Sequence, residues 1–337
     1  MAFSQSNLHI SRPLTDLVVA YDPAQDGMLR NFFFPRKPVD KLSNQIRQIS
    51  KADMLRLYDM KAAGDSKVQE VQFRTDTTLS YSAQVYAAEA VISQLENLNA
   101  DEELEYEQRQ TMAAFSAMSV NLEWQAINGV LRNTAAMTQN ATASVSSRWD
   151  NYSSSASDPI ADLLSAITLV QLQTGKKFNR LAMGQYTWRK LQQHPNVLSR
   201  VTFSGGAGSL LTLEILAGLL DIEGGAKNIV ISPATYNSAR HGETAIYKQF
   251  IGSDVLIARV EDPSLSDFGL GHEFAFSGFN GDGFAAIKYP DPARGVLGSD
   301  LVKIVSMVDY KVLNPTAGYL LKTVLNTASA EYGGFID

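Results

Sequence analysis

Cysteine is absent from the 337 residues of the chain. Its absence excludes disulfide bonds, thiolate metal sites and cysteine nucleophiles, and it fits synthesis in a reducing cytosol. No uncharged apolar run reaches about 18 residues, so we expect no membrane-spanning helix. Residues 1–22 lack a basic segment followed by an apolar one, so we expect no signal peptide.

Excess positive charge is also missing. The chain has 29 Lys and Arg against 35 Asp and Glu, a net charge of −6, and its basic residues form no dense cluster. Proteins that hold nucleic acid by neutralising its phosphates need such a cluster, so we do not expect a general nucleic-acid-binding protein. The 45% hydrophobic and 19% charged residues are typical of a globular chain, and the length suggests about two domains.

Motifs that carry chemistry are missing too. The four histidines show no metal-ligand spacing, and no Gly-x-Ser-x-Gly nucleophile motif occurs. Residues 280–283, Asn-Gly-Asp-Gly, lack the spaced oxygen ligands of a calcium loop and are interpreted as a hairpin turn. Residues 204–209, SGGAGS, are expected to open a helix, but the Gly-Lys-Ser/Thr of a phosphate-binding loop does not follow. We expect no catalytic, cofactor or metal site, and His194 is interpreted as a helix cap before Pro195.

Residues 71–87 alternate between apolar and polar side chains, with the apolar ones mostly at odd positions. This pattern is typical of a strand with one buried face. A typical strand has about 5–6 residues, whereas this alternation would span roughly 60 Å at about 3.3 Å per residue. The segment is therefore bent or broken, or it projects as an arm.

A turn at residues 61–68 precedes this alternation, and residues 44–60 would supply the strand that pairs with it. We interpret residues 46–92 as a two-stranded excursion. An isolated hairpin is only marginally stable in water, so the excursion must lie on another surface, most simply another copy of the chain. The alternative is two ordinary strands within a domain sheet.

Residues 31–41, NFFFPRKPVDK, place three phenylalanines beside Pro35 and Pro38, which favour an extended chain. One interpretation is a terminal segment that covers its own core. The other is an arm whose phenylalanines dock on a neighbouring subunit.

Residues 99–132 predict one long helix. Apolar residues recur at helical spacing from Met112 to Val130, and Asn99 or Asp101 would cap its start. The acidic residues near its start would face the positive end of the helix dipole. We interpret this acidic run as a solvated first turn and not as a metal site.

Residues 158–262 alternate between predicted helices and strands, which is typical of a small α/β unit. The first helix is predicted to begin at Pro159, behind a cap from Ser157 or Asp158. It is expected to end at Gly175, with the two following lysines against its negative end. Its buried stripe is expected at Ile160, Leu163, Leu164, Ile167 and Val170. From residue 268 the chain is predicted to return to strands.

Taken in order, these segments resemble the major capsid proteins of tailed bacteriophages, which share the Hong Kong 97-type fold. Residues 31–41 resemble the end of the family's N-terminal arm. Residues 85–127 resemble the return of its extended loop into the spine helix, with Glu123 near the end. Residues 157–201 are the most similar part and would open the axial domain. Residues 289–325 resemble the closing segment, in which the familiar positions are Arg294, Gly298, Ser299, Asp300 and Tyr319.

The resemblance implies an α+β fold with an extended β-hairpin loop, a spine helix with a peripheral-domain sheet, and an α/β axial domain. The implied parts are an N-terminal arm (1–45), the extended loop (46–95), the spine helix with the first part of the peripheral domain (96–157), the axial domain (158–262), returning peripheral strands (263–312) and a C-terminal strand and tail (313–337).

The serine-rich residues 146–164 then admit two interpretations, a flexible linker between independent domains or a crossing inside one subunit. We favour the crossing. Residues 146–151 are predicted to finish a strand beside the spine helix, and residues 152–159 to form a surface turn and helix cap.

The resemblance also implies a function, a structural one without enzymatic activity or cofactor. Hexamers and pentamers of the chain would close into an icosahedral shell around double-stranded DNA, contacted non-specifically, in a virion assembled in the bacterial host cytoplasm. Candidate partners besides other copies are scaffolding, portal and decoration proteins, and no membrane is involved. No Lys–Asn crosslinking motif can be placed and no long scaffolding segment is found, so we expect no crosslink and a separate scaffolding protein.

Two other functions remain open at this point. One is the shell of an encapsulin, a cellular nanocompartment with the same fold, and the other is a nucleotide-using α/β enzyme built on residues 158–262. For the capsid hypothesis, the residues expected at assembly interfaces are Phe32, Phe33, Phe34, Arg36, Gly64, Asp65, Phe73, Arg74, Tyr81, Arg294 and Asp300.

Overall fold

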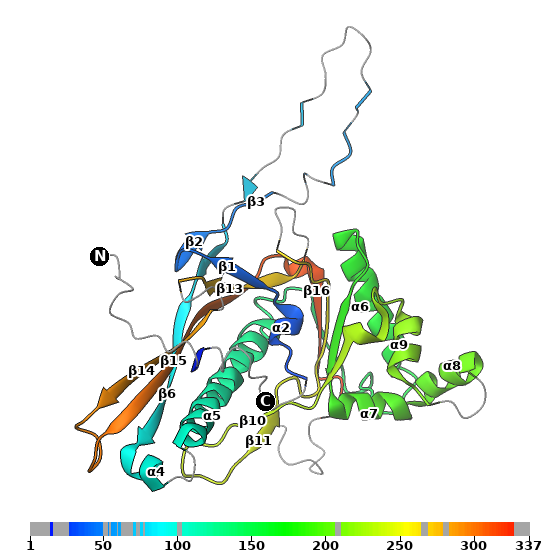
Figure 1. Cartoon of the computed structure of the whole chain (residues 1–337). Helices are drawn as coiled ribbons and strands as arrows, with labels where there is room; N and C mark the ends of the chain where they lie inside the picture. Colours follow the sequence, from blue (N-terminus) through cyan, green and yellow to red (C-terminus); the bar gives the residue numbers. More distant parts are fainter. Residues whose placement is uncertain are drawn as a thin grey trace.

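The structure is a computed structural model. It describes residues 14–15, 27–49, 53, 55–58, 60–61, 70–71, 75–76, 78–99, 103–205, 210–263, 269–278 and 283–326. Within these ranges two larger sheets each form a layer with helices packed on it (Figure 1). The mixture of helices and sheets agrees with the predicted α+β class.

The first sheet is built around one long strand, β15 (Ser299–Val312). On it pair β6 (Gln84–Ser93), β13 (Gly271–Phe276) and β14 (Phe284–Asp291), and β1 (Arg36–Val39) pairs in parallel with β13. Even-numbered residues of β15 from Val302 to Tyr310 are buried. The alternation expected of a strand with one covered face is therefore present.

The long helix α5 (Glu103–Trp124) packs on the covered face of this sheet (Figure 1). Phe115 meets Phe284 of β14 edge-on, with ring centroids 5.3 Å apart. The predicted single helix over 99–132 is only partly right. Asn99 ends a separate short helix, α4 (Gln94–Asn99), and Asp101 lies outside the described residues. At the other end, residues Gln125–Leu131 form a π-helix.

The prediction that the strands on either side of residues 280–283 pair as a hairpin is wrong. β13 and β14 do not pair with each other; both run antiparallel to β15, with Ala275 opposite Val308 and Phe284 opposite Ser306. Residues 279–282 themselves lie outside the described part. The hairpin instead joins β14 to β15 through residues 292–298, where Gly295 and Gly298 adopt φ of 84°.

The second sheet has the order β7-β16-β12-β8-β9. Its strands are β7 (Asn140–Thr142), β8 (Arg180–Gly184), β9 (Ile229–Ser232), β12 (Val255–Ala258) and β16 (Gly318–Lys322). Helices α6 (Pro159–Thr174), α7 (Gln185–Gln193), α8 (Pro195–Gly205) and α9 (Leu213–Leu220) accompany it (Figure 1). α7 ends at Gln193, and Pro195, which was predicted to stop it, is the first residue of the next helix, α8.

The ends of α6 agree with the prediction. The Asp158 side chain accepts a hydrogen bond from the Ala161 amide at 3.2 Å, and Gly175 has a left-handed φ of 69°. The predicted buried stripe is correct except at Leu164, which is 39% exposed. Ala166 is buried in its place, because it lies on the face that meets the sheet.

Residues 143–158 are turns, so the strand predicted to end at residues 146–151 is wrong. The short strand β7 lies earlier and pairs in parallel with β16 of the second sheet. Trp149 explains the difference. Its indole is fully buried in the core beneath α6, and its amide donates to the Val324 carbonyl at 2.7 Å. A large buried side chain in this segment favours the crossing over a free linker.

The two-stranded excursion is present at its base. β2 (Ser43–Gln45) pairs with β5 (Ser80–Ser82), and β3 (Gln48–Ile49) pairs with β4 (Thr75–Asp76), both antiparallel. β2 and β3 rise away from the first sheet (Figure 1). The alternation changes phase between β5 and β6. Tyr81 is buried at an odd position, whereas Ala90 and Ile92 of β6 are buried at even ones.

Among the helices that the structure describes, none has the length and apolar character needed to cross a membrane.

Gly271→Ala tests the register of β13 on β15. A Cβ at residue 271 would lie 2.0 Å from the Lys311 carbonyl oxygen, a backbone atom that cannot move without disturbing the pairing. We expect this variant to lose about 3 kcal/mol of unfolding free energy, the upper range for overpacking. The measurement is urea denaturation of the full chain.

Gly218→Ala is the matched control. Residue 218 lies inside α9 with no atom within 4 Å of the added Cβ. Its stability should rise by up to about 1 kcal/mol, since alanine is the better helix former. Equal midpoints for the two variants would contradict the described contact.

Candidate assembly surfaces

Glu123, near the end of α5, holds the N-terminal part of the described chain. Its carboxylate accepts hydrogen bonds from the amides of Leu29 at 2.6 Å and Arg30 at 3.0 Å. These amides begin the four-residue helix α2 (Arg30–Phe33), which has no cap from its own sequence. Burial raises the pKa of Glu123, and the two amide donors and Arg30 oppose that rise.

A buried cluster of charged and polar groups surrounds this contact. Arg30 is 6% exposed and lies near Tyr310 of β15 and Glu273 of β13. Burial opposes the charge on Arg30, but these neighbours outweigh it, so its pKa is raised. Arg36 of β1 reaches Glu273 with Nη2 at 3.0 Å and Nε at 3.1 Å. The cluster therefore ties α2 and β1 to α5 and to the first sheet.

The predicted interface residues in this segment lie on the chain's own core. Phe33 and Phe34 are fully buried, and Phe34 packs on Tyr310 with ring centroids 5.6 Å apart. This corrects the expectation that they dock on a neighbour and agrees with a segment covering its own core. Phe32 is half-buried, with the Arg180 guanidinium 4.8 Å from its ring centre.

The other predicted interface residues divide into three groups. Tyr81 is buried and stacks on Phe274 at 4.7 Å, so it too serves the chain's own packing. Arg294 is exposed and lies 3.1 Å from Glu89, whereas Asp300 is half-buried and pairs with Lys288 at 3.3 Å. Gly64, Asp65, Phe73 and Arg74 lie outside the described residues.

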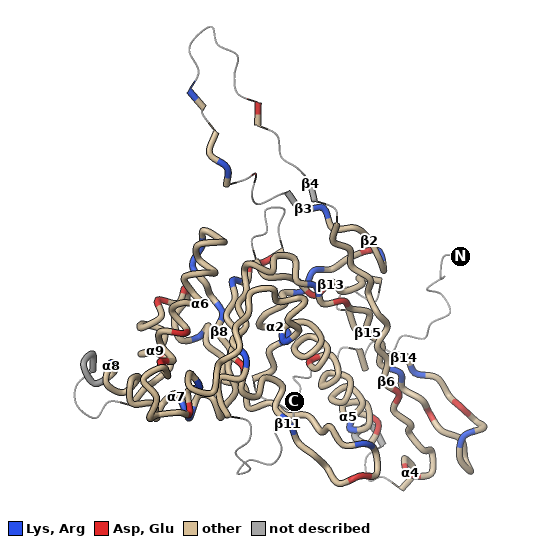
Figure 2. Tube along the Cα trace, turned by 180° about the vertical axis from the view of Figure 1, so that it is seen from behind, with Lys and Arg blue, Asp and Glu red and all other residues tan. Residues whose placement is uncertain are grey.

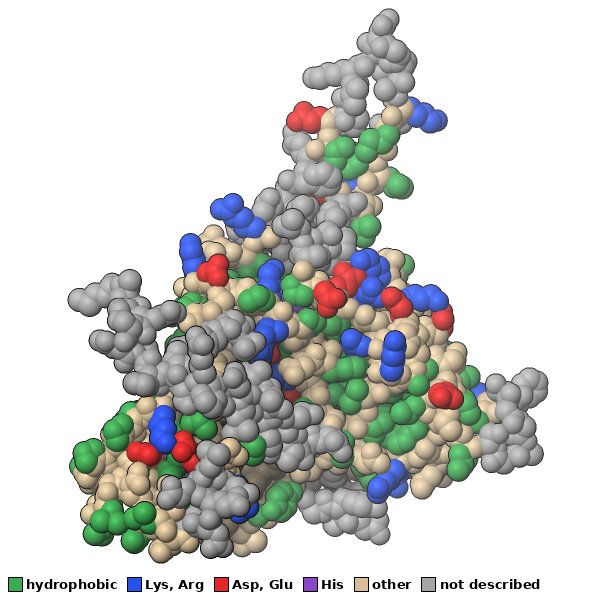
Figure 3. Space-filling model, viewed as in Figure 1, with side chains coloured by type: hydrophobic (Ala, Val, Ile, Leu, Met, Phe, Trp, Pro, Cys, Tyr) green, Lys and Arg blue, Asp and Glu red, His purple; other side chains and the backbone are tan. Residues whose placement is uncertain are grey.

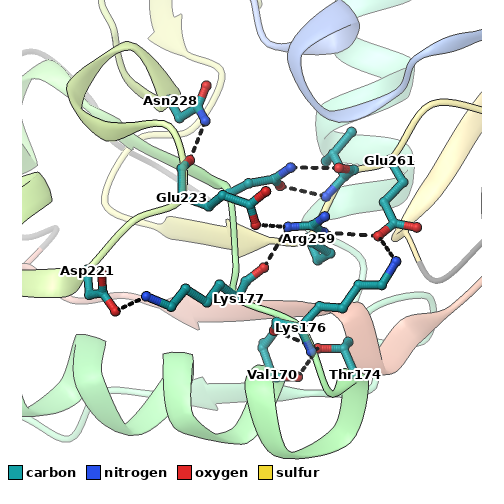
Figure 4. Close-up of polar contacts among 11 residues, drawn as sticks. Val170, Thr174, Lys176, Lys177, Asp221, Glu223, Asn228, Arg259 and Glu261 are labelled. Atoms are coloured by element: carbon teal, nitrogen blue, oxygen red, sulfur yellow. Dashed lines mark hydrogen bonds and ion pairs between the residues drawn. The ribbon is translucent and has the colours of Figure 1, made fainter.

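A polar network closes one end of the second sheet (Figure 4). Arg259, just after β12, bonds to Glu223, to Glu261 at 3.1 Å and to the Lys177 carbonyl at 2.9 Å. Lys176 reaches the same Glu261 oxygen at 2.6 Å. Lys176 and Lys177 therefore hold neighbouring loops together. The loops beside them, with α2, line a cavity of about 400 Å³ in which positive and negative side chains balance.

Exposed apolar side chains gather at three places among the described residues. The first is the excursion, with Leu55, Leu57 and Met60, of which Leu57 is 98% exposed. The second, which we call the tip cluster, consists of Leu95 and Leu98 of α4 with Val296 and Leu297 of the β14–β15 turn. The Gln94 amide donates to the Gly298 carbonyl at 3.3 Å, so α4 and the turn lie side by side. Apolar side chains are exposed at this corner of the molecule, among polar and backbone atoms (Figure 3, lower left).

The third place is the outer face of α6, which carries no charged residue. Leu164, Leu169 and Leu172 are exposed on it, Leu172 at 79%. Ser165 and Thr168, on the same face, donate their hydroxyl hydrogens back to the carbonyls of Ala161 and Leu164. Because these hydroxyls already have hydrogen-bond partners, burying the face against another surface would leave neither of them without a partner.

Sequence reasoning missed the tip cluster and the α6 face. A signal for the tip was present, since Val296 and Leu297 are apolar residues between Gly295 and Gly298 in a turn. Among the described residues no group of three potential metal ligands comes together. Lys, Arg, Asp and Glu are interspersed along the described trace, without a long run of one sign (Figure 2).

Glu123→Gln tests how the N-terminal segment is held. Glutamine keeps one acceptor oxygen but turns an amide donor toward a backbone N–H, so the variant should lose about 1–3 kcal/mol. Trypsin should then cut faster after Arg30 and Arg36, as followed by mass spectrometry. Glu214→Gln, an exposed glutamate on α9, is the control. Equal cleavage rates in the two variants would show that Glu123 does not hold the segment.

No protein-family model matches the sequence, and no curated protein matches it. Solved structures do match. A phage-related protein from Bordetella bronchiseptica RB50 is 19% identical, with a TM-score of 0.70 over 94% of this chain and 98% of the other. The capsid of cyanophage P-SCSP1u gives 12% identity and a TM-score of 0.54 over 90% and 89% of the chains. An encapsulin complex from Synechococcus elongatus PCC 7942 gives 14% identity and a TM-score of 0.51 over 91% and 92%. The chain therefore has the Hong Kong 97-type fold that phage capsid proteins share with encapsulins.

Proposed function

We propose that the chain is a major capsid protein whose hexamers and pentamers close into an icosahedral shell around double-stranded phage DNA. The observation that carries the proposal is a fold shared over 94% of the chain with a phage-related protein, at a TM-score of 0.70. The role is structural, so no catalytic residue, cofactor or metal is assigned.

The exposed apolar surfaces support assembly from many copies. A side chain such as Leu57, at 98% exposure on a two-stranded excursion, gains nothing from its own chain. Burying apolar surface on another copy would yield about 25 cal/mol per Å². The excursion, the tip cluster and the α6 face are three different surfaces, so contacts between them are heterologous. Heterologous contacts generate closed rings when the rotation between successive copies closes on itself.

The charge of the chain suits a container for DNA. With a net charge of −6 the wall would contact packaged DNA only weakly and without sequence preference. Scaffolding, portal and decoration proteins are candidate partners of such a shell. Its location would be the virion, after assembly in the bacterial host cytoplasm. The division into arm, extended loop, peripheral and axial parts is part of this proposal.

An encapsulin shell is the second candidate, and the fold shared with the Synechococcus complex favours it. The two candidates differ in what the shell encloses. Nuclease-protected DNA in purified particles would favour the capsid, and an enclosed protein cargo would favour the encapsulin.

A nucleotide-using enzyme finds no support in the described residues. Ser204 and Gly205 close α8 and do not open a helix, which corrects the expectation for the SGGAGS segment; residues 206–209 lie outside the described part. The next helix, α9, begins at Leu213 and is capped by the Thr212 side chain. The amides of a phosphate site are therefore not placed there.

Particle size tests the proposal directly. The full chain, expressed alone and with a candidate scaffolding protein, should form regular hollow shells in electron micrographs and sediment far faster than a monomer. A stable monomer or dimer under every condition would refute the proposal.

Leu57→Asp tests the excursion as an assembly element. A carboxylate at this exposed site should leave the fold within about 0.5 kcal/mol of the parent, while shell yield falls at least tenfold because a charge would be buried between copies. Deleting residues 60–70 should have the same effect with the axial unit still folded. Val145→Asp, at a residue 71% exposed outside the three surfaces, should assemble normally. Normal shells from Leu57→Asp and from the deletion would remove the excursion from the proposal.

A further inference from the structure

The crossing segment, residues 146–158, is fastened to the start of α8 by a buried serine and histidine. Ser157 is fully buried, and its hydroxyl donates to the Arg148 carbonyl at 2.8 Å. The same oxygen lies 3.0 Å from Nε2 of His194, which is 2% exposed. The Asn196 side chain adds a bond to the Ser157 carbonyl at 2.9 Å. The crossing thus depends on His194 for one of its few buried polar contacts.

The hydrogen-bond partners fix the protonation of this ring. The Ser157 hydroxyl has one hydrogen, which is directed at Arg148, so the hydroxyl can only accept from Nε2. Nδ1 lies 3.2 Å from the backbone nitrogen of Asn196 and must accept a hydrogen bond from that N–H. The ring is therefore neutral, with its hydrogen on Nε2. This arrangement also excludes a nucleophile–base pair, because a base would have to accept the serine hydrogen.

Protonation of the ring would place a second hydrogen on Nδ1. That hydrogen would point at the Asn196 N–H, and two donors cannot share a bond. The ring would then have to turn, and turning it also breaks the Nε2 contact with Ser157. The ring is nearly inaccessible to water, so no solvent can take over either contact in place.

The charged groups around the ring do little to favour the protonated form. Asp158, next to Ser157, is the one carboxylate that favours it, but Arg200 of α8 lies 2.6 Å from that carboxylate. Asp162 of α6 accepts a hydrogen bond from the Trp149 indole at 2.9 Å. From α7, Lys190 contributes a carbonyl to the Tyr152 hydroxyl, and the Tyr152 ring meets the histidine edge-on at 5.5 Å. Burial consequently lowers the pKa of His194, with Asp158 opposing.

We infer that the Ser157–His194 hydrogen bond is sensitive to acid: it holds residues 146–158 on α8 at neutral pH and breaks, releasing them, when the ring is protonated. The sign follows from linkage. A histidine whose pKa is lower in the fastened state than when released contributes its full stabilisation above about pH 6.5, and the contribution falls as the pH drops through that value. The segment is thus expected to open on acidification while the rest of the second sheet stays folded.

Hydrogen–deuterium exchange of the full chain, read by mass spectrometry, tests the inference in any assembly state. The protection of amides in peptides covering 146–158, corrected for intrinsic exchange rates, should fall as the pH is lowered from 7.5 to 5.5. The fall should be at most about tenfold per pH unit, because the opening is coupled to the uptake of one proton. Peptides from β12 and β16 should not follow. In His194→Gln, which cannot be protonated, the protection should be independent of pH. His241→Gln, at an exposed histidine, should behave as the parent does.

Exchange at the C2 hydrogens of the histidines supplies a second measurement that needs no variant. His194 should titrate below the ordinary histidine value of about 6.5, and its titration should coincide with the opening of residues 146–158. Protection that does not change with pH in the parent chain would overturn the inference. So would a His194 that titrates at or above about pH 6.5, even if His194→Gln failed to fold. None of these outcomes depends on whether the chain builds a shell.

Discussion

The buried carboxylate of Glu123 sets the constraint from which the N-terminal half of the fold follows. A carboxylate taken out of water is costly unless donors surround it, and here the donors are the first amides of α2. Once these amides are fixed, Phe33 and Phe34 must lie between α5 and β15. The chain then leaves toward β1, whose pairing with β13 is held by Arg36 and Glu273. β2, which pairs with β5 at the base of the excursion, follows β1 along the chain.

Exposed and buried apolar groups are divided unevenly between the parts of the molecule. Both sheets bury their facing residues with α5 and with α6, so each layer has a complete core. Many of the large apolar residues left exposed lie on the excursion, at the tip cluster and on the outer face of α6. A chain that needed these residues for its own stability would bury them. Their position at separate edges is what a repeating contact between copies requires, because each copy must offer surfaces on more than one side.

The sequence was sufficient to predict those elements whose ends depend only on residues within about one turn. The cap at Asp158, the proline after it and the glycine at 175 define α6, and all three depend on neighbours within a turn. The path after β13 could not be predicted in this way, since a glycine-rich turn is equally compatible with a hairpin and with a strand that continues along β15. The phase change before β6 was hidden because Ala83 and Ala87 are small enough for either face. Trp149 looked like the end of a strand, and only the core beneath α6 shows why it lies in a turn.

Two buried titratable groups fasten the chain in different places, and they respond to acid in opposite ways. The pKa of Glu123 is raised above its ordinary value of 4.5, because burial disfavours the charged form. Its contribution is therefore most favourable below that value and declines as the pH rises toward the raised pKa. The pKa of His194 is lowered from 6.5, so its contribution declines as the pH falls. Between neutral pH and about pH 5.5, acid thus weakens the hold on residues 146–158 and does not weaken the hold of Glu123 on α2. A fold held in this way can loosen one crossing while α5, the first sheet and the base of the excursion remain in place.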